Sequence, residues 1–203
     1  MQENLIIIFA RNPKLGKVKT RLAASIGDEM ALKIYTLLLE HTAKVTHQVK
    51  SDKMVFYSEN VEKNDLWTQF KFLKSKQPNG DLGQRMAYAF DHTFAMGYKK
   101  VILIGSDAYS LQSKHLETAF SALQNHDVVL GPATDGGYYL LGLKTIIPSI
   151  FKNKKWSESS VLEATLGDLK KFNTHLIEPL NDIDTFEDLK KEPQLLKQLN
   201  IHD

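Results

Sequence analysis

The sequence contains no cysteine in its 203 residues. That absence excludes disulfide bonds, zinc–thiolate sites and thiol catalysis, and it is compatible with a reducing compartment. The seven histidines show no metal-ligand spacing such as His-Glu-x-x-His. A Gly-x-Ser-x-Gly nucleophile elbow is missing as well, so the motifs do not indicate a serine hydrolase of that kind.

Long apolar runs and a strong net charge are equally absent. No segment approaches the ~18 consecutive apolar residues of a transmembrane helix. The first apolar run, Leu5–Ala10, follows no basic leader, so we expect a buried strand there and a cytoplasmic protein. The net charge of +2, from 26 basic and 24 acidic residues, gives no support for a nucleic-acid partner.

The remaining composition is that of an ordinary globular protein, 42% hydrophobic and 25% charged, and predicts one domain over residues 1–203. Short apolar runs without alternation indicate strands that are covered on both faces, as in parallel sheets. These runs are Leu5–Ala10, Met54–Tyr57, Val101–Ile104 and Val128–Leu130.

Helical patterns lie between and after these runs, at Asp28–Val45, Leu82–Met96, Gln112–Leu123, Ser157–Leu169 and Thr185–Leu189. Strand–helix alternation predicts a three-layer α/β/α sandwich with right-handed crossovers. Two further strand-like stretches, Tyr138–Leu143 and Asn173–Ile177, break this rhythm. The central sheet is therefore expected to be mostly parallel but mixed.

A basic segment follows the first strand. Between Ala10 and Leu22 lie five basic residues and one glycine, Arg11, Lys14, Gly16, Lys17, Lys19 and Arg21. A flexible basic loop at the carboxyl end of a buried strand suits a di- or triphosphate, although a solvated loop would have the same composition. It is not a Walker P-loop, because Arg11 replaces the first glycine and Val18 follows Lys17.

Two acids follow other predicted strands. Asp107, in Gly105-Ser106-Asp107, is a candidate ligand for a divalent metal, or it caps the next helix. Asp184, in Asp182-Ile183-Asp184-Thr185, can cap the helix that it precedes. If the fold brings the two together, they give magnesium two carboxylates and leave positions for phosphate oxygens and water.

Two turns contain glycine beside an acid. In Gly80-Asp81-Leu82-Gly83-Gln84-Arg85, Asp81 is a plausible helix N-cap, and Arg85 in the first turn could bind an anion. In Thr134-Asp135-Gly136-Gly137-Tyr138, two glycines let a ligand approach the backbone. Either segment alone could be only a turn.

Taken in order, these segments closely resemble a small bacterial family, glycosyltransferase-like and largely uncharacterised, within the GT-A-fold nucleotide-diphospho-sugar transferase superfamily. Some members of that family are associated with arsenosugar biosynthesis. The resemblance covers the chain from Leu5 to about Leu189. The chain is more distantly similar to guanylyltransferases of molybdenum-cofactor and phospholactate metabolism. One difference is visible, because the family pattern usually has proline two residues after the metal acid, where this chain has Tyr109.

The resemblance implies a GT-A, Rossmann-like fold that binds a nucleotide over the first strand through the Lys17–Arg21 loop. It implies Mg²⁺ or Mn²⁺ on Asp107 and Asp184, with Asp135 and the glycines after it facing the acceptor or the transferred group. The full predicted nucleotide or phosphate site is Ala10, Arg11, Gly16, Lys17, Lys19, Thr20, Arg21, Gly80, Asp81 and Arg85. The predicted catalytic residues are Asp107 and Asp135, and the predicted substrate-binding residues are Gly136, Gly137 and Tyr138.

Three functions are consistent with such a site. The first is a metal-dependent glycosyltransferase that uses a nucleotide-sugar and a small-molecule acceptor. The second is a nucleotidyltransferase that joins a nucleoside triphosphate to a phosphorylated acceptor and releases pyrophosphate; the basic loop favours it, since three phosphates need more cation than two. The third is a nucleotide-binding protein without catalysis.

Overall fold

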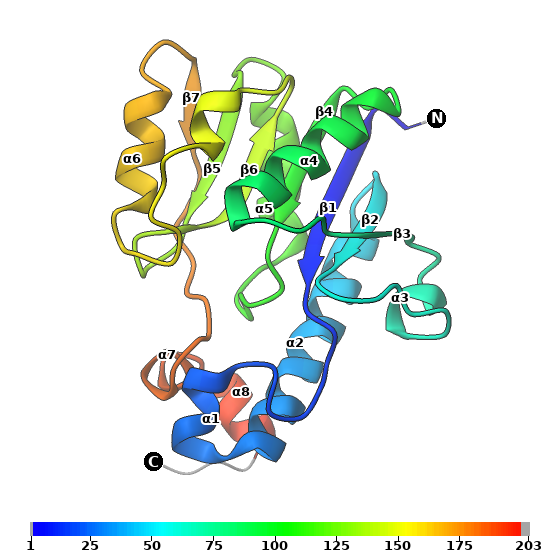
Figure 1. Ribbon diagram of the computed structural model, residues 1–203, viewed down its shortest axis with the longest axis vertical. Helices are drawn as coiled ribbons and strands as arrows, with labels where there is room; N and C mark the ends of the chain where they lie inside the picture. The colour runs from blue at the N-terminus through cyan, green and yellow to red at the C-terminus, as the bar shows by residue number, and fades with distance from the viewer. Residues whose placement is uncertain (1, 200–203) are drawn as a thin grey trace.

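The computed structural model describes residues 2–199 and contains a seven-stranded sheet with helices on both faces (Figure 1). The strand order is β3-β2-β1-β4-β6-β5-β7. Strand β6 pairs antiparallel with β4 and with β5, whereas the other pairs in this sheet are parallel. The predicted α/β/α sandwich with a mostly parallel, mixed sheet is therefore confirmed.

The elements in chain order are β1 Asn4–Ala10, α1 Thr20–Ile26, α2 Asp28–Gln48, β2 Asp52–Tyr57, α3 Leu66–Gln69, β3 Leu73–Lys76, α4 Leu82–Ala95, β4 Lys100–Ile104, α5 Ser113–Ala122, β5 Val128–Pro132, β6 Tyr138–Leu143, the 3-10 helix η1 Pro148–Phe151, α6 Val161–Asp168, β7 Thr174–Leu176, α7 Phe186–Lys190 and α8 Pro193–Leu199. Each predicted strand and helix has a counterpart, with boundaries shifted by a few residues. Across residues 2–199, none of the helices combines the length and the apolar character that a membrane crossing requires.

Strand β1 shows why the sheet needs helices on both sides. Ile6 and Ile8 belong to an apolar cluster with α2, α3 and α5, whereas Leu5 and Ile7 belong to a second cluster with α4, η1 and α6. All four side chains are fully buried. Because successive side chains of a strand point to opposite faces, a continuous apolar run can only be buried between two layers.

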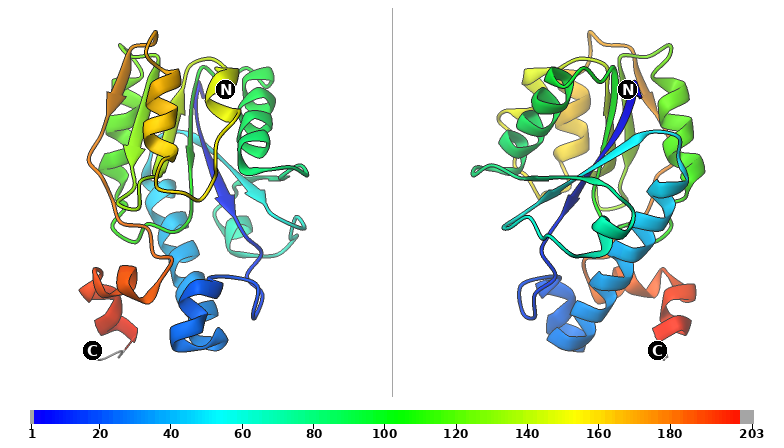
Figure 2. Two further views of the ribbon diagram at one scale, coloured as in Figure 1. Left: turned by 60° about the vertical axis from the view of Figure 1, so that its left-hand side comes forward. Right: turned by 90° about the vertical axis from the view of Figure 1, so that its right-hand side faces the viewer.

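A third apolar cluster lies beyond the carboxyl ends of the parallel strands (Figures 1 and 2). It joins α1, the first half of α2, α7 and α8, through residues such as Leu22, Ile34, Ile183 and Leu195. The stretch after β1 was expected to be a flexible loop throughout, but it ends in α1, because Leu22 is buried in this cluster. The segments that reach this cluster, after β1 and after β7, pass over the edge of the sheet and frame the site.

Candidate functional site

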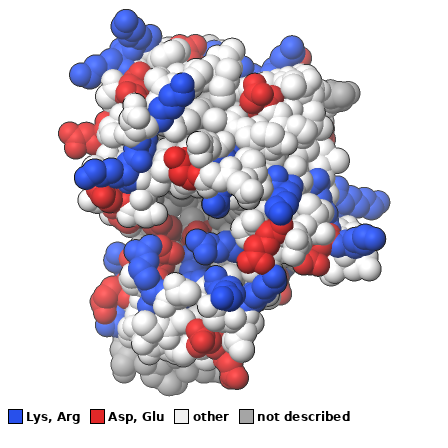
Figure 3. Space-filling model, in the orientation of Figure 1, with Lys and Arg blue, Asp and Glu red and all other residues white. Residues whose placement is uncertain are grey.

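A cleft of about 650 Å³ lies at the carboxyl edge of the sheet. Ligands of open α/β sheets bind at this edge. Figure 3 shows lysine, arginine and acidic side chains gathered around a hollow between the sheet and the third cluster. The predicted site residues that line the cleft are Ala10, Arg11, Lys17, Lys19, Thr20, Arg21, Arg85, Asp107, Asp135, Gly137, Tyr138 and Asp184.

Four predicted site residues are not among those that line the cleft, and each has a role in the backbone near it. Gly16 and Gly80 have φ values of 67° and 128°, which favour glycine. Asp81 caps α4, where its Oδ1 accepts from the backbone N–H of Gln84 at 2.8 Å. Gly136 packs against the backbone of Ser159, where a Cβ would lie 2.2 Å from the carbonyl oxygen.

Lys19 lies at the centre of the predicted metal and phosphate site. Its Nζ is 2.7 Å from Asp107 Oδ1 and 3.0 Å from Asp184 Oδ1, and its side chain is only 5% exposed. Burial lowers the pKa of Lys19, but the attraction of the two carboxylates more than offsets this effect and raises it. The backbone of Lys19 is left-handed, with φ 48°. Non-glycine residues in that region cluster at functional sites.

Asp184 also forms an ion pair with Arg21, whose Nη2 contacts Asp184 Oδ2. Burial raises the pKa of Asp184, but Lys19 and Arg21 together lower it below its usual value, so the carboxylate is ionised. Asp184 does not cap α7 as the sequence suggested. Thr185 is the N-cap, in a capping box with Asp188. Asp184 is thereby left to the cleft.

Asp107 does not cap a helix either, because α5 begins at Ser113 with Gln112 as its N-cap. The backbone carbonyl of Asp107 accepts from the N–H of Ile183 at 3.0 Å, which holds the two acidic segments side by side. The fold therefore brings together the acids that sequence reasoning could only align in order.

Asp182 is a cleft residue that the sequence prediction left out. Burial, and then the charge of Asp135, raise the pKa of Asp182 to about 6, with smaller contributions from Asp107 and Asp184. The sequence signal that could have identified Asp182 as a cleft residue is the alternation Asp182-Ile183-Asp184. Ile183 is fully buried, so in an extended segment the acids on either side of it point the other way.

Two buried side chains that support the β1 loop were also missed. The Tyr35 hydroxyl accepts from the backbone N–H of Arg11 at 2.7 Å and lies 3.4 Å from Ser106 Oγ. Burial, with the charge of Asp107, raises the pKa of Tyr35 to about 12. Asn12 donates to the carbonyl of Asn60 at 2.8 Å and is 4% exposed. Tyr35 lies outside the segments predicted to form the site, and Asn12 lies in the basic segment without a charge to mark it, so only tertiary structure could identify them.

The pair Asp107 and Asp184 has the donor chemistry that Mg²⁺ and Mn²⁺ accept, namely carboxylate oxygens that leave room for phosphate and water. Lys19 Nζ lies between these two carboxylates, so the geometry already holds a positive charge there. Within residues 2–199, no group of three or more histidine or acidic side chains is arranged to hold a metal alone. A metal here would thus need phosphate oxygens or water to complete its ligands.

Tyr109, in the place of the family's proline, packs into the third cluster. Its ring lies 4.9 Å from that of His41, and its hydroxyl donates to Gln198 Oε1 at 3.3 Å. The side chain therefore ties the loop after Asp107 to α2 and α8.

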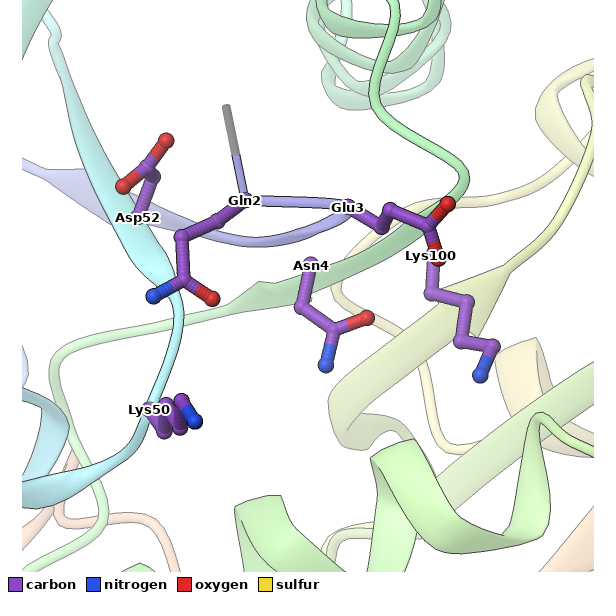
Figure 4. A pocket seen from close by; sticks show the side chains of 6 residues that line it. All are labelled: Gln2, Glu3, Asn4, Lys50, Asp52 and Lys100. Carbon is purple, nitrogen blue, oxygen red and sulfur yellow. The ribbon is translucent and has the colours of Figure 1, made fainter.

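A second depression, of about 750 Å³, lies at the opposite edge of the sheet, at the amino ends of β1, β2 and β4 (Figure 4). It is lined by Gln2, Glu3, Asn4, Lys50, Asp52 and Lys100. It is wide open to solvent, and its two acids balance its two lysines. We place the site in the cleft instead, because Lys19, with its left-handed backbone, meets Asp107 and Asp184 there.

The sequence matches a family profile described as an uncharacterized protein conserved in bacteria (DUF2064), over residues 41–158. A crystal structure from Desulfovibrio desulfuricans G20, of a candidate nucleotide-diphospho-sugar transferase, is similar with a TM-score of 0.84 and 27% identity. The similarity covers 98% of each chain. Among curated proteins, no sequence is similar enough to this chain to count as a relative.

Two more distant structures share the fold. A cytidylyltransferase from Leptospira borgpetersenii has a TM-score of 0.63 and 16% identity, over 98% of this chain and 88% of that one. Glucosyl-3-phosphoglycerate synthase from Mycobacterium tuberculosis, solved with Mn²⁺, uridine diphosphate and glucosyl-3-phosphoglycerate, has a TM-score of 0.56 and 9% identity, over 100% of this chain and 81% of that one. One fold thus serves both nucleotidyl and glycosyl transfer.

Proposed function

The chain belongs to the DUF2064 family of bacterial proteins, and on that premise we propose that it is a transferase with a nucleotide-activated donor. The nucleotide lies over the end of β1, with its phosphates on Lys17, Lys19 and Arg21. The transferred group is a sugar, so that the donor is a nucleotide-diphospho-sugar. The name of the Desulfovibrio neighbour supports the same class.

The observation that carries the proposal is the buried Lys19 held between Asp107 and Asp184, at the edge of the sheet where ligands bind. A diphosphate brought to this position would find Lys19, Lys17 and Arg21 as donors of charge-assisted hydrogen bonds. Mg²⁺ or Mn²⁺ held by the two carboxylates would supply further positive charge to the diphosphate leaving group.

Asp135 is the proposed base, or hydrogen-bond acceptor, for the acceptor hydroxyl. Its Oδ1 accepts from the backbone N–H of Gly137 at 2.8 Å, which fixes the carboxylate at the turn between β5 and β6. The other oxygen, Oδ2, is left to approach a ligand. Gly137 and Tyr138 line the part of the cleft that faces the transferred group or the acceptor, and Gly136 packs behind them against the backbone of Ser159.

Nucleotidyl transfer is the second candidate. Five basic side chains line the cleft, Arg11, Lys17, Lys19, Arg21 and Arg85, and that number suits a triphosphate. The same carboxylates and lysines would serve, but the bond broken would be at the α-phosphorus.

A thermal-shift screen of nucleoside triphosphates and nucleotide-sugars, each with Mg²⁺ and with Mn²⁺, tests the proposal. We expect a metal-dependent stabilisation that is lost in Asp107→Asn. Turnover then separates the candidates, since release of nucleoside diphosphate indicates glycosyl transfer and release of pyrophosphate indicates nucleotidyl transfer. Stabilisation with neither product would leave a binding protein without catalysis, and no stabilisation by any nucleotide would refute the proposal.

A further inference from the structure

The basic side chains of the cleft are sorted by position in the chain, whereas its acids come from several segments and include Glu59 and Asp107. Every basic side chain that lines it belongs to residues 11–85, and we call these five residues the basic side: Arg11, Lys17, Lys19, Arg21 and Arg85. Within the described residues, no lysine or arginine of segment 133–184 lines the cleft. That segment contributes the acids Asp135, Glu158, Asp182 and Asp184 instead.

The same segment contributes an aromatic side chain to the lining. Trp156 lines the cleft and packs against the second apolar cluster, as Tyr138 does. Its indole also lies against the first turn of α4, where a Cβ on Gly83 would be 2.6 Å from the ring. We call Asp135, Tyr138, Trp156, Glu158 and Asp182 the Trp156 wall. Leu82, Met86 and Val161 extend its apolar surface.

The Trp156 wall is built by close packing, not by a loose surface loop. Gly136 has φ 93°, and a Cβ there would overlap the carbonyl of Ser159. The carbonyl of Gly136 accepts from the N–H of Leu162 at 3.0 Å. Lys154, whose side chain is 3% exposed, pairs with Asp168 of α6 and anchors the segment before Trp156. The wall is therefore formed before a ligand arrives.

We infer that the Trp156 wall is a subsite for a neutral, polyhydroxylated ring or chain, a sugar or polyol without phosphate. The apolar face of such a compound can lie on the indole, and its hydroxyls can donate to the carboxylates of Asp135 and Glu158. A phosphate placed there would meet like charges and no cation from the wall. Lys155 lies 4.0 Å from Glu158, but it is 79% exposed and is outside the lining.

This inference rests on the proposed function and deepens it. A neutral acceptor favours transfer to a hydroxyl, as in glycosyl transfer, over attack by an acceptor phosphate. The same chemistry has two sources, because the hydroxylated group is either the sugar of the donor or a separate acceptor. An unbroken nucleotide-sugar tests the first source, and a free sugar added with nucleoside diphosphate and Mn²⁺ tests the second.

Trp156 provides its own reporter. The chain has two tryptophans, and Trp67 is 3% exposed in the first apolar cluster, so Trp67→Phe leaves Trp156 as the single tryptophan, which can be excited selectively over the tyrosines. This variant would be titrated with D-glucose, D-ribose and glycerol, and with glucose 6-phosphate, ribose 5-phosphate and glycerol 3-phosphate. Each titration would be made alone and with nucleoside diphosphate and Mn²⁺, and nucleotide-sugars would be titrated separately.

With nucleoside diphosphate and Mn²⁺ occupying the basic side, at least one neutral compound is expected to change the Trp156 fluorescence and to bind at least about tenfold more tightly than its phosphate, a difference of about 1.4 kcal/mol. Calorimetry with Trp156→Ala should show this binding lost. The double variant Asp135→Asn with Glu158→Gln should bind the neutral compound more weakly. Its preference for the neutral compound over the phosphate should also be smaller.

Three results would overturn the inference: equal or tighter binding of the phosphates in the presence of nucleoside diphosphate and Mn²⁺, unchanged binding to Trp156→Ala, or no change of Trp156 fluorescence with any neutral compound or nucleotide-sugar. The thermal shift by nucleotides is a separate readout that depends on the basic side. A thermal shift with nucleotide, without binding of any neutral compound at Trp156, refutes the subsite alone. Neutral binding without any nucleotide shift refutes the proposed function and leaves the subsite standing.

Discussion

The basic side and the Trp156 wall face the same cleft but are stabilised in different ways. On the basic side, Lys19 neutralises Asp107 and Asp184, and Arg21 adds a second cation to Asp184. On the wall, Asp135 repels Asp182, and the raised pKa of Asp182 records both its burial and that repulsion. The comparison teaches that cations already pair with the acids beside the basic side, whereas no basic side chain of segment 133–184 lines the wall, which agrees with the inferred subsite for a neutral, hydroxylated compound.

Asp107→Asn should have the largest effect, because it removes charge where the two sides meet. We expect turnover of the nucleotide-sugar to fall by about 100-fold or more, the usual cost of losing a group that stabilises developing charge. Steady-state kinetics with Mn²⁺ would measure it, with the melting temperature as the control for folding. Activity within tenfold of the native protein would remove Asp107 from the proposed metal site.

Gly136→Ala should be the most damaging change to the structure of the wall. The new Cβ would lie 2.2 Å from Ser159 O on a backbone with φ 93°, so we expect a loss of about 2–3 kcal/mol in the free energy of unfolding. Gly167→Ala in α6 is the matched control, since its Cβ meets nothing within 4 Å. Urea unfolding should show that control gaining about 0.5–1 kcal/mol. Equal losses in both would contradict the close packing.

Lys19→Met should separate the two roles of the basic side. Loss of a charged hydrogen-bond donor is worth about 1.5–3 kcal/mol, so nucleoside diphosphate should bind about 10- to 100-fold more weakly. Mn²⁺ without nucleotide should bind more tightly, because Asp107 and Asp184 lose their shared cation. Calorimetry would measure both, and Lys17→Met, an exposed cleft residue with no such pair, should change only nucleotide binding.

Asp182→Asn should have the smallest effect, and it should depend on pH. The folded-state pKa of Asp182 is raised to about 6, so the folded protein holds this proton more tightly than the unfolded chain. Stability from this group is therefore lost as pH rises through about 6. The variant should gain on the order of 1 kcal/mol at about pH 7 and nothing below about pH 4. Unfolding curves at both pH values test it, and an equal gain at each would contradict the repulsion.

The sequence predicted the fold well because its strong signals are local. Apolar runs such as Leu5–Ala10 and the capping box at Asp81 depend on neighbours in the chain. Helix α1 was missed because the burial of Leu22 depends on α7 and α8, far away in the sequence. Helix α3 and strand β3 are four residues each, too short to show a period. One domain over residues 1–203 and a cytoplasmic location stay predictions.

Residues that line the cleft were predicted where a motif marked them and were missed where only tertiary packing brings them there. Lys19, Asp107 and Asp184 stand out in charged or glycine-containing turns. No sequence pattern marks Tyr35 on its helix, Asn12 in its loop or Trp156 after a lysine run, although all three line the cleft. Their place in the cleft follows from how strands and loops pack together in the folded protein, and this packing cannot be inferred from the sequence.

The most direct test of the sorted cleft is calorimetry of nucleoside diphosphate with Mn²⁺ on Arg21→Ala and Glu158→Gln. Both side chains are largely exposed, at 65% and 55%, so neither change should affect folding. We predict that Arg21→Ala binds the nucleotide at least about tenfold more weakly, and that Glu158→Gln stays within about twofold of the native protein. Equal losses in the two variants, or a larger loss in Glu158→Gln, would contradict the assignment of the phosphates to the basic side.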